Sequence, residues 1–223
     1  MVKAILFDLD DTLYDEKTYV ASGFRSVARD LESEIGMPSD RLFGEMMSIL
    51  EADGRGRVFD LVLQRHGSYC KDRVLELVDL YRHHQPDIEP YPDVLPVLEE
   101  LQRNGYLLGL ITNGFHVMQK KKVDALGVAR HMDTLVYPDE LGSNRWKPHP
   151  AGFLKGLDEL AVSPEKAMYV GNDAEKDVEP AREAGMISVQ MCRPGLNTVK
   201  SSKADLFVES TEEINAILKK KME

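Results

Sequence analysis

Cysteine is nearly absent from this sequence, which has only Cys70 and Cys192 among 223 residues. The two match neither a metal-binding nor a redox spacing, so neither a zinc site nor dithiol chemistry is expected. Long apolar runs are missing as well. The opening run Val2–Phe7 is too short for a signal peptide, and no segment approaches the length that crosses a membrane. Reduced thiols and the lack of such segments predict a cytoplasmic protein.

Positive charge is in deficit. The chain has 28 lysine and arginine residues against 38 aspartate and glutamate residues, a formal net charge of −10. Such a field repels nucleic acids and anionic membrane surfaces, so neither is expected as a partner. It would also repel an anionic substrate, unless the pocket carries cations of its own. The sequence leaves open whether the protein is a monomer or a homodimer.

The spacing of apolar residues changes along the chain. Val2–Phe7 has no polar face, which is typical of a strand buried on both faces of a parallel sheet. Over residues 16–88 apolar residues recur at helical spacing, which predicts four helices and no strand. Gly36 is expected to end the first of them, and Ser39 or Asp40 to cap the second. This stretch is therefore predicted to be a helical insertion.

After residue 88 strands and helices alternate, which predicts an α/β fold with a doubly wound parallel sheet. Residues 1–15 and 89–223 are expected to form this domain, and residues 16–88 a second one. Asp93 is expected to cap the first helix after the insertion. Further strands are predicted at Leu107–Thr112, Thr134–Tyr137, Ala167–Val170, Ile187–Met191 and Leu206–Val208, and further helices at His116–Leu126, after Pro150, at Lys176–Ala184 and at Glu212–Lys221.

Polar residues stand where the predicted strands end. In an open parallel sheet the ligand binds beyond the carboxyl ends of the strands, so these residues are expected to meet at one rim. They supply four carboxylates, one hydroxyl and one ammonium, from Asp8, Asp10, Thr112, Lys147, Asp173 and Asp177.

Four carboxylates in one cleft repel one another unless some are protonated or a cation joins them. Hard carboxylate oxygens without histidine or thiolate favour Mg²⁺, which commonly bridges carboxylates to a substrate phosphate. Lys147 adds a second positive centre. The hydroxyl of Thr112, with backbone amides around Asn113 and Gly114, can donate hydrogen bonds to anionic oxygens. The rim is therefore predicted to attract a phosphate group.

Asp8 and Asp10 are two residues apart, so an extended backbone would project both carboxylates to the same side. One can attack phosphorus. The other can protonate the leaving oxygen and then activate water, which combines covalent with general acid–base catalysis.

Four segments resemble, in family order, the four motifs of the haloacid dehalogenase superfamily of hydrolases. They are Phe7–Leu13, Leu110–Gly114, Lys147–Pro150 and Asp173–Asp177, and together they span nearly the whole chain. The resemblance is to members with a helical cap inserted after the first strand, such as phosphoglycolate phosphatases. It implies a Rossmann-like core, with residues 16–88 as an all-helical cap domain.

The resemblance also implies roles for the acidic residues. Asp8 would be the nucleophile, and Asp10 the general acid and base. Mg²⁺ would bind Asp8, the backbone carbonyl of Asp10, and Asp173, with Asp177 supporting the metal shell. The fourth motif of the family often reads Gly-Asp, whereas here Asn172 precedes Asp173, so Asn172 could take the place of the direct ligand.

The remaining roles concern the substrate. Thr112, with Asn113 and Gly114, would bind the phosphate, and Lys147 would contact both the nucleophile and the phosphate. Dehalogenases of the superfamily lack an acid at the position of Asp10, so the resemblance favours a phosphomonoester hydrolase that acts on a small phosphorylated metabolite. A 2-haloacid dehalogenase, a phosphomutase and a non-catalytic phosphate-binding regulator remain as alternatives. The run Lys120–Lys122 is interpreted as a solvated helix face.

Overall fold

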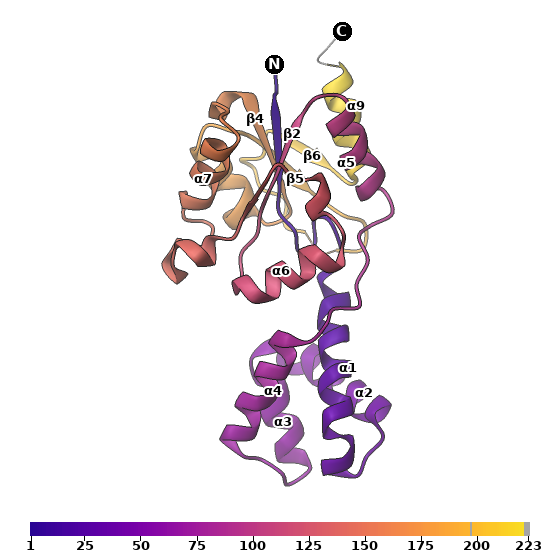
Figure 1. Ribbon diagram of the computed structural model, residues 1–223. Helices are drawn as coiled ribbons and strands as arrows, with labels where there is room; N and C mark the ends of the chain where they lie inside the picture. Colours follow the sequence, from indigo (N-terminus) through magenta and orange to yellow (C-terminus); the bar gives the residue numbers. More distant parts are fainter. Residues whose placement is uncertain (197, 221–223) are drawn as a thin grey trace. The chain divides into compact units, whose positions relative to one another are not determined.

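The computed structural model describes residues 1–196 and 198–220. The chain divides into two compact units: Met1–Asp15 together with Glu89–Glu223, and Glu16–Ile88. The first unit is a sheet flanked by helices, and the second is helical (Figure 1).

The sheet has six strands in the order β3-β2-β1-β4-β5-β6, and every neighbouring pair is parallel. This is the predicted doubly wound, Rossmann-like α/β fold. The central strand β1 is apolar and buried along its whole length, as its uninterrupted apolar run requires. The strands are β1 (Ala4–Phe7), β2 (Leu107–Ile111), β3 (Thr134–Val136), β4 (Ala167–Gly171), β5 (Ile187–Met191) and β6 (Leu206–Val208).

Helices cover both faces of this sheet. Figure 1 shows α7 on one side, and α5 and α9 on the other. Phe153 and Leu157 of α7 pack into a buried cluster with Leu6 and Tyr169 of the central strands. The helices are α5 (Val94–Arg103), α6 (His116–Ala125), α7 (Ala151–Glu159), α8 (Glu179–Glu183) and α9 (Thr211–Lys220). The predicted last residue of α9, Lys221, lies outside the described residues.

The helix predicted at Lys176–Ala184 is not one regular helix. It starts earlier, as a π-helical segment at Ala174–Val178, and continues as α8. Pro180 has no N–H to donate to the carbonyl four residues earlier, and its ring would clash with that carbonyl, so a regular α-helix cannot run through this point.

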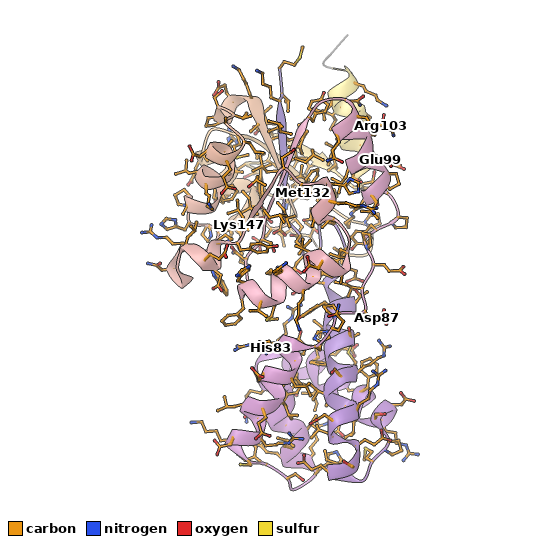
Figure 2. All side chains as sticks on the ribbon, viewed as in Figure 1. His83, Asp87, Glu99, Arg103, Met132 and Lys147 are labelled. Atoms are coloured by element: carbon orange, nitrogen blue, oxygen red, sulfur yellow. The ribbon has the colours of Figure 1, made fainter. Side chains whose placement is uncertain are left out.

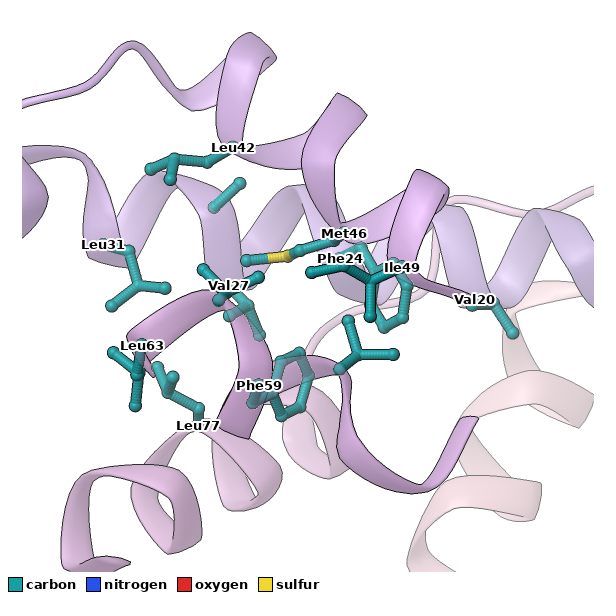
Figure 3. Close-up of a cluster of buried hydrophobic side chains, with 13 residues drawn as sticks. Val20, Phe24, Val27, Leu31, Leu42, Met46, Ile49, Phe59, Leu63 and Leu77 are labelled. Atoms are coloured by element: carbon teal, nitrogen blue, oxygen red, sulfur yellow. The ribbon is translucent and has the colours of Figure 1, made fainter. Parts of the chain in front are cut away.

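The second unit consists of helices packed on their apolar faces. Thirteen buried residues form one core (Figure 3), to which all four α-helices of the unit contribute. Gly36 has a φ of +71° and follows α1, so the predicted end of that helix is correct. No strand occurs among residues 16–88, all of which the structure describes. The helices are α1 (Glu16–Ile35), α2 (Ser39–Asp53), α3 (Val58–Arg65) and α4 (Lys71–His83).

The predicted cap of α2 is wrong. The helix already includes Ser39, so Pro38 is the flanking residue, and no side chain accepts a capping hydrogen bond. The carbonyl of Pro38 accepts the N–H groups of Arg41 and Leu42 instead.

Asp93 is the N-cap residue of α5, as predicted, but its side chain makes no capping hydrogen bond to that helix. Its carboxylate accepts two hydrogen bonds from Arg193, at 2.8 and 2.9 Å, and the backbone N–H of Thr211 at 2.7 Å. The carboxylate of Asp93 thus binds the first turn of α9, which is far away in the sequence. Arg193 also donates to the carbonyl of Thr12, at 3.1 and 3.2 Å. One ion pair therefore joins the starts of α5 and α9 to the segment after β1.

We expect Asp93→Asn to destabilise the sheet-containing unit by about 2 kcal/mol at neutral pH, because charged hydrogen bonds are lost and Arg193 stays buried. Urea unfolding followed by the fluorescence of Trp146, which belongs to this unit and is the sole tryptophan of the sequence, measures the loss. The exposed Asp158→Asn is the matched control.

The loss of stability caused by Asp93→Asn should depend on pH. Burial alone would raise the pKa of the Asp93 carboxyl, but hydrogen bonds from Thr211 and Arg193 outweigh it and lower that pKa. The stabilisation is therefore present above the ordinary aspartate pKa of about 4 and fades as pH falls through the lowered value. An equal gap between wild type and variant at pH 7 and pH 3 would contradict this account.

Candidate active site

The carboxylate of Asp8 is buried at the end of β1. The backbone N–H of Asp8 donates to the carbonyl of Val170 at 2.8 Å, which extends the pairing of β1 with β4. Its Oδ1 accepts a hydrogen bond from Nζ of Lys147 at 2.5 Å. Burial raises the pKa of the Asp8 carboxyl above its usual value; Lys147 opposes the rise, and Asp177 and Asp10 add to it.

Lys147 brings its ammonium to the rim from the loop before α7 (labelled in Figure 2). Besides Asp8, Nζ donates to Oδ1 of Asp177 at 2.6 Å and to the hydroxyl of Tyr169 at 2.9 Å. Burial alone would lower the pKa of Lys147, but the charges of Asp177 and Asp8 raise it well above its usual value. Lys147 is therefore a fixed cation between two carboxylates.

The side chain of Asn113 holds the backbone of Lys147 in place. Its amide nitrogen donates to the carbonyl of Lys147 at 2.9 Å, and its carbonyl oxygen accepts the N–H of Lys147 at 2.8 Å. Asn113 was predicted to bind phosphate through its backbone, and its side chain has this separate, structural contact.

The end of β4 carries the other predicted acids. Oδ2 of Asp177 accepts the backbone N–H of Asp173 at 3.0 Å, so Asp177 links Lys147 to the Asp173 loop. Oδ1 of Asp173 accepts the N–H groups of Glu175 and Lys176, both at 2.9 Å. Nζ of Lys176 contacts the other oxygen of Asp173 at 3.0 Å. Asp173 therefore caps the π-helical segment in this structure.

Asn172 lies in the same loop. Its backbone carbonyl accepts a hydrogen bond from the side-chain amide of Gln190 at 3.0 Å.

The carboxylate of Asp10 contacts three side chains that the sequence interpretation did not select. Oδ1 accepts hydrogen bonds from Nζ of Lys122 at 2.7 Å and from the hydroxyl of Tyr14 at 2.5 Å. Oδ2 accepts one from the amide of Gln119 at 2.9 Å, and the same amide donates to Oγ1 of Thr112. The ends of β1 and β2 are thereby connected through α6.

The interpretation of Lys120–Lys122 as a solvated face is wrong for Lys122, which is only 3% exposed. The helical phase could have revealed this. Gln119, Lys122, Val123 and Leu126 follow the spacing of one helix face, and all four are buried, whereas Lys120 is exposed.

The predicted rim residues therefore fall into two hydrogen-bonded groups. One contains Asp8, Lys147, Asp177 and the backbone of Asp173; the other contains Asp10 and Thr112. Gly114, two residues after Thr112, has a φ of +128°, which favours glycine.

The sequence matches a family of known hydrolases. A family model described as "haloacid dehalogenase-like hydrolase" matches residues 2–185. The chain belongs to this family.

Relatives of the chain within these hydrolases are named as phosphatases. A glyceraldehyde 3-phosphate phosphatase of Methanopyrus kandleri is 34% identical and aligns over 86% of this chain and 85% of its own. A phosphoglycolate phosphatase of Aquifex aeolicus is 30% identical over 82% of both chains. The crystal structure of a HAD phosphatase from Thermococcus onnurineus superposes with a TM-score of 0.66 at 29% identity, covering 97% of this chain and 98% of that one. The predicted family and the predicted enzyme class, a hydrolase, are confirmed.

The donor chemistry of the rim fits a hard divalent cation. Four carboxylates stand here against two buried ammonium groups, those of Lys147 and Lys122, and neither histidine nor thiolate takes part in the hydrogen bonds described above. Among residues 1–196 and 198–220, no three His, Cys, Asp or Glu side chains are grouped so as to hold a metal ion. The predicted ligand set does not need such a group, because it comprises two carboxylates and one backbone carbonyl.

Within the part of the chain that the structure describes, none of the helices combines the length and the apolar character needed to cross a membrane.

Gly171, the last residue of β4, lies directly against the side chain of Asp177. A Cβ atom at this position would lie 2.4 Å from Cγ of Asp177. We expect Gly171→Ala to destabilise the unit by about 2 kcal/mol, because overpacking displaces Asp177 from Lys147. Urea unfolding followed by Trp146 fluorescence measures this.

The control for that variant is Gly44→Ala, since no atom lies within 4 Å of a Cβ built at Gly44. It should leave the Trp146 transition unchanged. A Gly171→Ala protein as stable as wild type would show that Asp177 can move without cost.

Proposed function

We propose that this chain is a magnesium-dependent phosphomonoester hydrolase that acts on a small phosphorylated metabolite through an aspartyl-phosphate intermediate on Asp8. The single observation that carries the proposal is the buried ion pair between Asp8 and Lys147 at the end of β1. Family membership and the names of the relatives support the reaction class.

Asp8 is the proposed nucleophile. Lys147 holds Oδ1 of its carboxylate, and Oδ2 is the oxygen that attacks phosphorus. The P–O bond to the leaving group breaks, the phosphoryl group is carried by Asp8, and Lys147 offsets its negative charge. Water then attacks the phosphorus atom, releases inorganic phosphate and restores the carboxylate.

Asp10 is the proposed general acid and base. It gives a proton to the leaving oxygen in the first step and takes one from the attacking water in the second. A dehalogenase needs no such proton, since halide leaves as an anion, so Asp10 favours phosphate esters as substrates. The hydroxyl of Thr112, with the backbone N–H groups of Asn113 and Gly114, is proposed to bind the phosphoryl oxygens.

Mg²⁺ would be held by Asp8, the backbone carbonyl of Asp10 and Asp173, with Asp177 and Asn172 around them. When bound it would neutralise charge on the phosphoryl group and orient it. To act as a ligand, Asp173 must release Oδ2 from Lys176, and that contact lies at the surface.

The two compact units are proposed to have different roles, catalysis in one and substrate selection in the other. All proposed catalytic and metal-binding residues belong to the unit of residues 1–15 and 89–223, which we propose as the catalytic core. Residues 16–88 are the proposed cap domain, which would select the substrate. The relatives named for glyceraldehyde 3-phosphate and phosphoglycolate make phosphates of two or three carbons the first substrates to test.

The proposal predicts Mg²⁺-dependent release of inorganic phosphate from p-nitrophenyl phosphate, glyceraldehyde 3-phosphate or phosphoglycolate. Asp8→Asn should lower turnover by at least about 1,000-fold, because the nucleophile is lost. Asp158→Asn, an exposed acid of the same unit, should retain full activity.

Each rival gives a different result in the same experiment. Chloride release from 2-chloropropionate without Mg²⁺ would indicate a dehalogenase, and an isomerised sugar phosphate without free phosphate would indicate a phosphomutase. Full activity of Asp8→Asn would refute the nucleophile. No turnover of any phosphate ester would favour a binding protein.

The direct ligand can be identified by titration with Mg²⁺. We expect Asp173→Asn to raise the Mg²⁺ concentration for half-maximal activity at least about 10- to 100-fold, because loss of a direct ligand should cost no less than loss of an outer-shell partner. Asn172→Ala, one residue away in the same loop, should shift it less. The opposite order would assign the ligand to Asn172.

A further inference from the structure

One face of α6 carries two buried polar side chains, Gln119 and Lys122, which are 2% and 3% exposed. They are three residues apart and therefore neighbours on the helix. Both reach Asp10, more than 100 positions earlier in the chain: Gln119 binds Oδ2, and Lys122 binds Oδ1.

Burial of an ammonium group costs several kcal/mol unless a carboxylate compensates it. A helix that packs on a sheet needs only apolar residues at its buried positions, so packing does not account for a lysine at position 122. Its ammonium lies 2.7 Å from Asp10, whose side chain keeps 23% of its surface exposed. Asp10 is thus anchored from the interior and still open on one side.

Gln119 adds a connection to the proposed phosphate-binding residue. Its amide nitrogen donates both to Oδ2 of Asp10 and to the hydroxyl oxygen of Thr112. Because that hydroxyl accepts from Gln119, its own hydrogen is directed elsewhere and can be donated to a phosphoryl oxygen. A Cβ atom at position 114 would lie 3.0 Å from Cδ of Gln119, so glycine there leaves room for this amide.

We propose that Gln119 and Lys122 are positioning residues: together they fix Asp10, the proton donor, relative to Thr112, the phosphate-binding group. This inference rests on the proposed phosphatase function. It assigns to α6 a role that none of the four family-like segments contains, since both residues lie between the second and the third segment.

The test uses two substrates of similar shape, p-nitrophenyl phosphate and phenyl phosphate. Nitrophenolate is a stable anion that leaves with little help from an acid, whereas phenolate needs a proton. The constant kcat/KM covers the steps up to departure of the leaving group. Loss of a well-placed acid should therefore lower kcat/KM for phenyl phosphate more than for p-nitrophenyl phosphate.

We expect Lys122→Met and Gln119→Met each to lower kcat/KM for phenyl phosphate at least about 10-fold more than for p-nitrophenyl phosphate, a part of the 100- to 10,000-fold that general acid–base catalysis supplies. Lys120→Met is the matched control. It changes the same residue type on the same helix, but Lys120 is exposed and pairs with Asp124, so it should change neither constant.

Asp10→Asn provides a second readout. If Lys122 acts through Asp10, Lys122→Met should cause no further loss of kcat/KM in an Asp10→Asn background. The double variant also removes both charges of the pair, so it should fold even if Lys122→Met alone leaves Asp10 buried without its partner and unfolds.

The outcomes separate this inference from the proposed function. Equal losses for both substrates, or a further loss in the Asp10→Asn background, would overturn the positioning role while wild-type turnover upholds the phosphatase. A wild-type protein that releases no phosphate from either substrate would overturn both.

Discussion

The arrangement of the site depends on one buried cation. The ammonium of Lys147 is stable in the interior only because Asp8 and Asp177 both lie within hydrogen-bond distance of it. These residues belong to the end of β1, the loop before α7, and the segment after β4. Compensation of a single charge therefore requires three distant parts of the chain to meet. The pairing of β1 with β4 and the amide of Asn113 hold them together.

A buried lysine also compensates the charge of Asp10, and this lysine belongs to α6. Lys122 compensates this carboxylate as Lys147 compensates Asp8, so Asp8 and Asp10 each have their own buried lysine. Both cations belong to a chain with a net charge of −10. The electrostatic field of the whole protein repels anions, while the two lysines give the rim the local positive charge that an anionic substrate needs. Two buried lysines and the exposed Lys176 at Asp173 stand against four acids, so negative charge remains in excess, which suits a divalent cation.

The sequence predicted those features that depend on short range or on topology. An apolar run predicts a buried strand, and parallel strands end at one edge, so the positions of Asp8 and Lys147 followed from the order of the elements. Side-chain partners more than 100 residues away could not be predicted in this way. The local capping rule predicted that the side chain of Asp93 binds its own helix, whereas in the structure it binds Arg193 and Thr211. The π-helical start before α8 was missed because Pro180 was not weighed against the helical spacing.

For Lys122, the helical spacing was a better guide to burial than the run of three consecutive lysines. Three consecutive lysines suggested a solvated surface, but the helical phase places one of them among buried residues, and burial of a lysine in turn demands an acid. Asp8 already binds Lys147, and Asp177 binds both Lys147 and the backbone of Asp173. Asp173 lies at the far side of β1 from β2, the strand that α6 follows. Of the four rim acids, Asp10 is the one left within reach of α6. Phase, charge and strand order together would thus have identified its partner, since a buried charge restricts the possible neighbours more than an apolar side chain does.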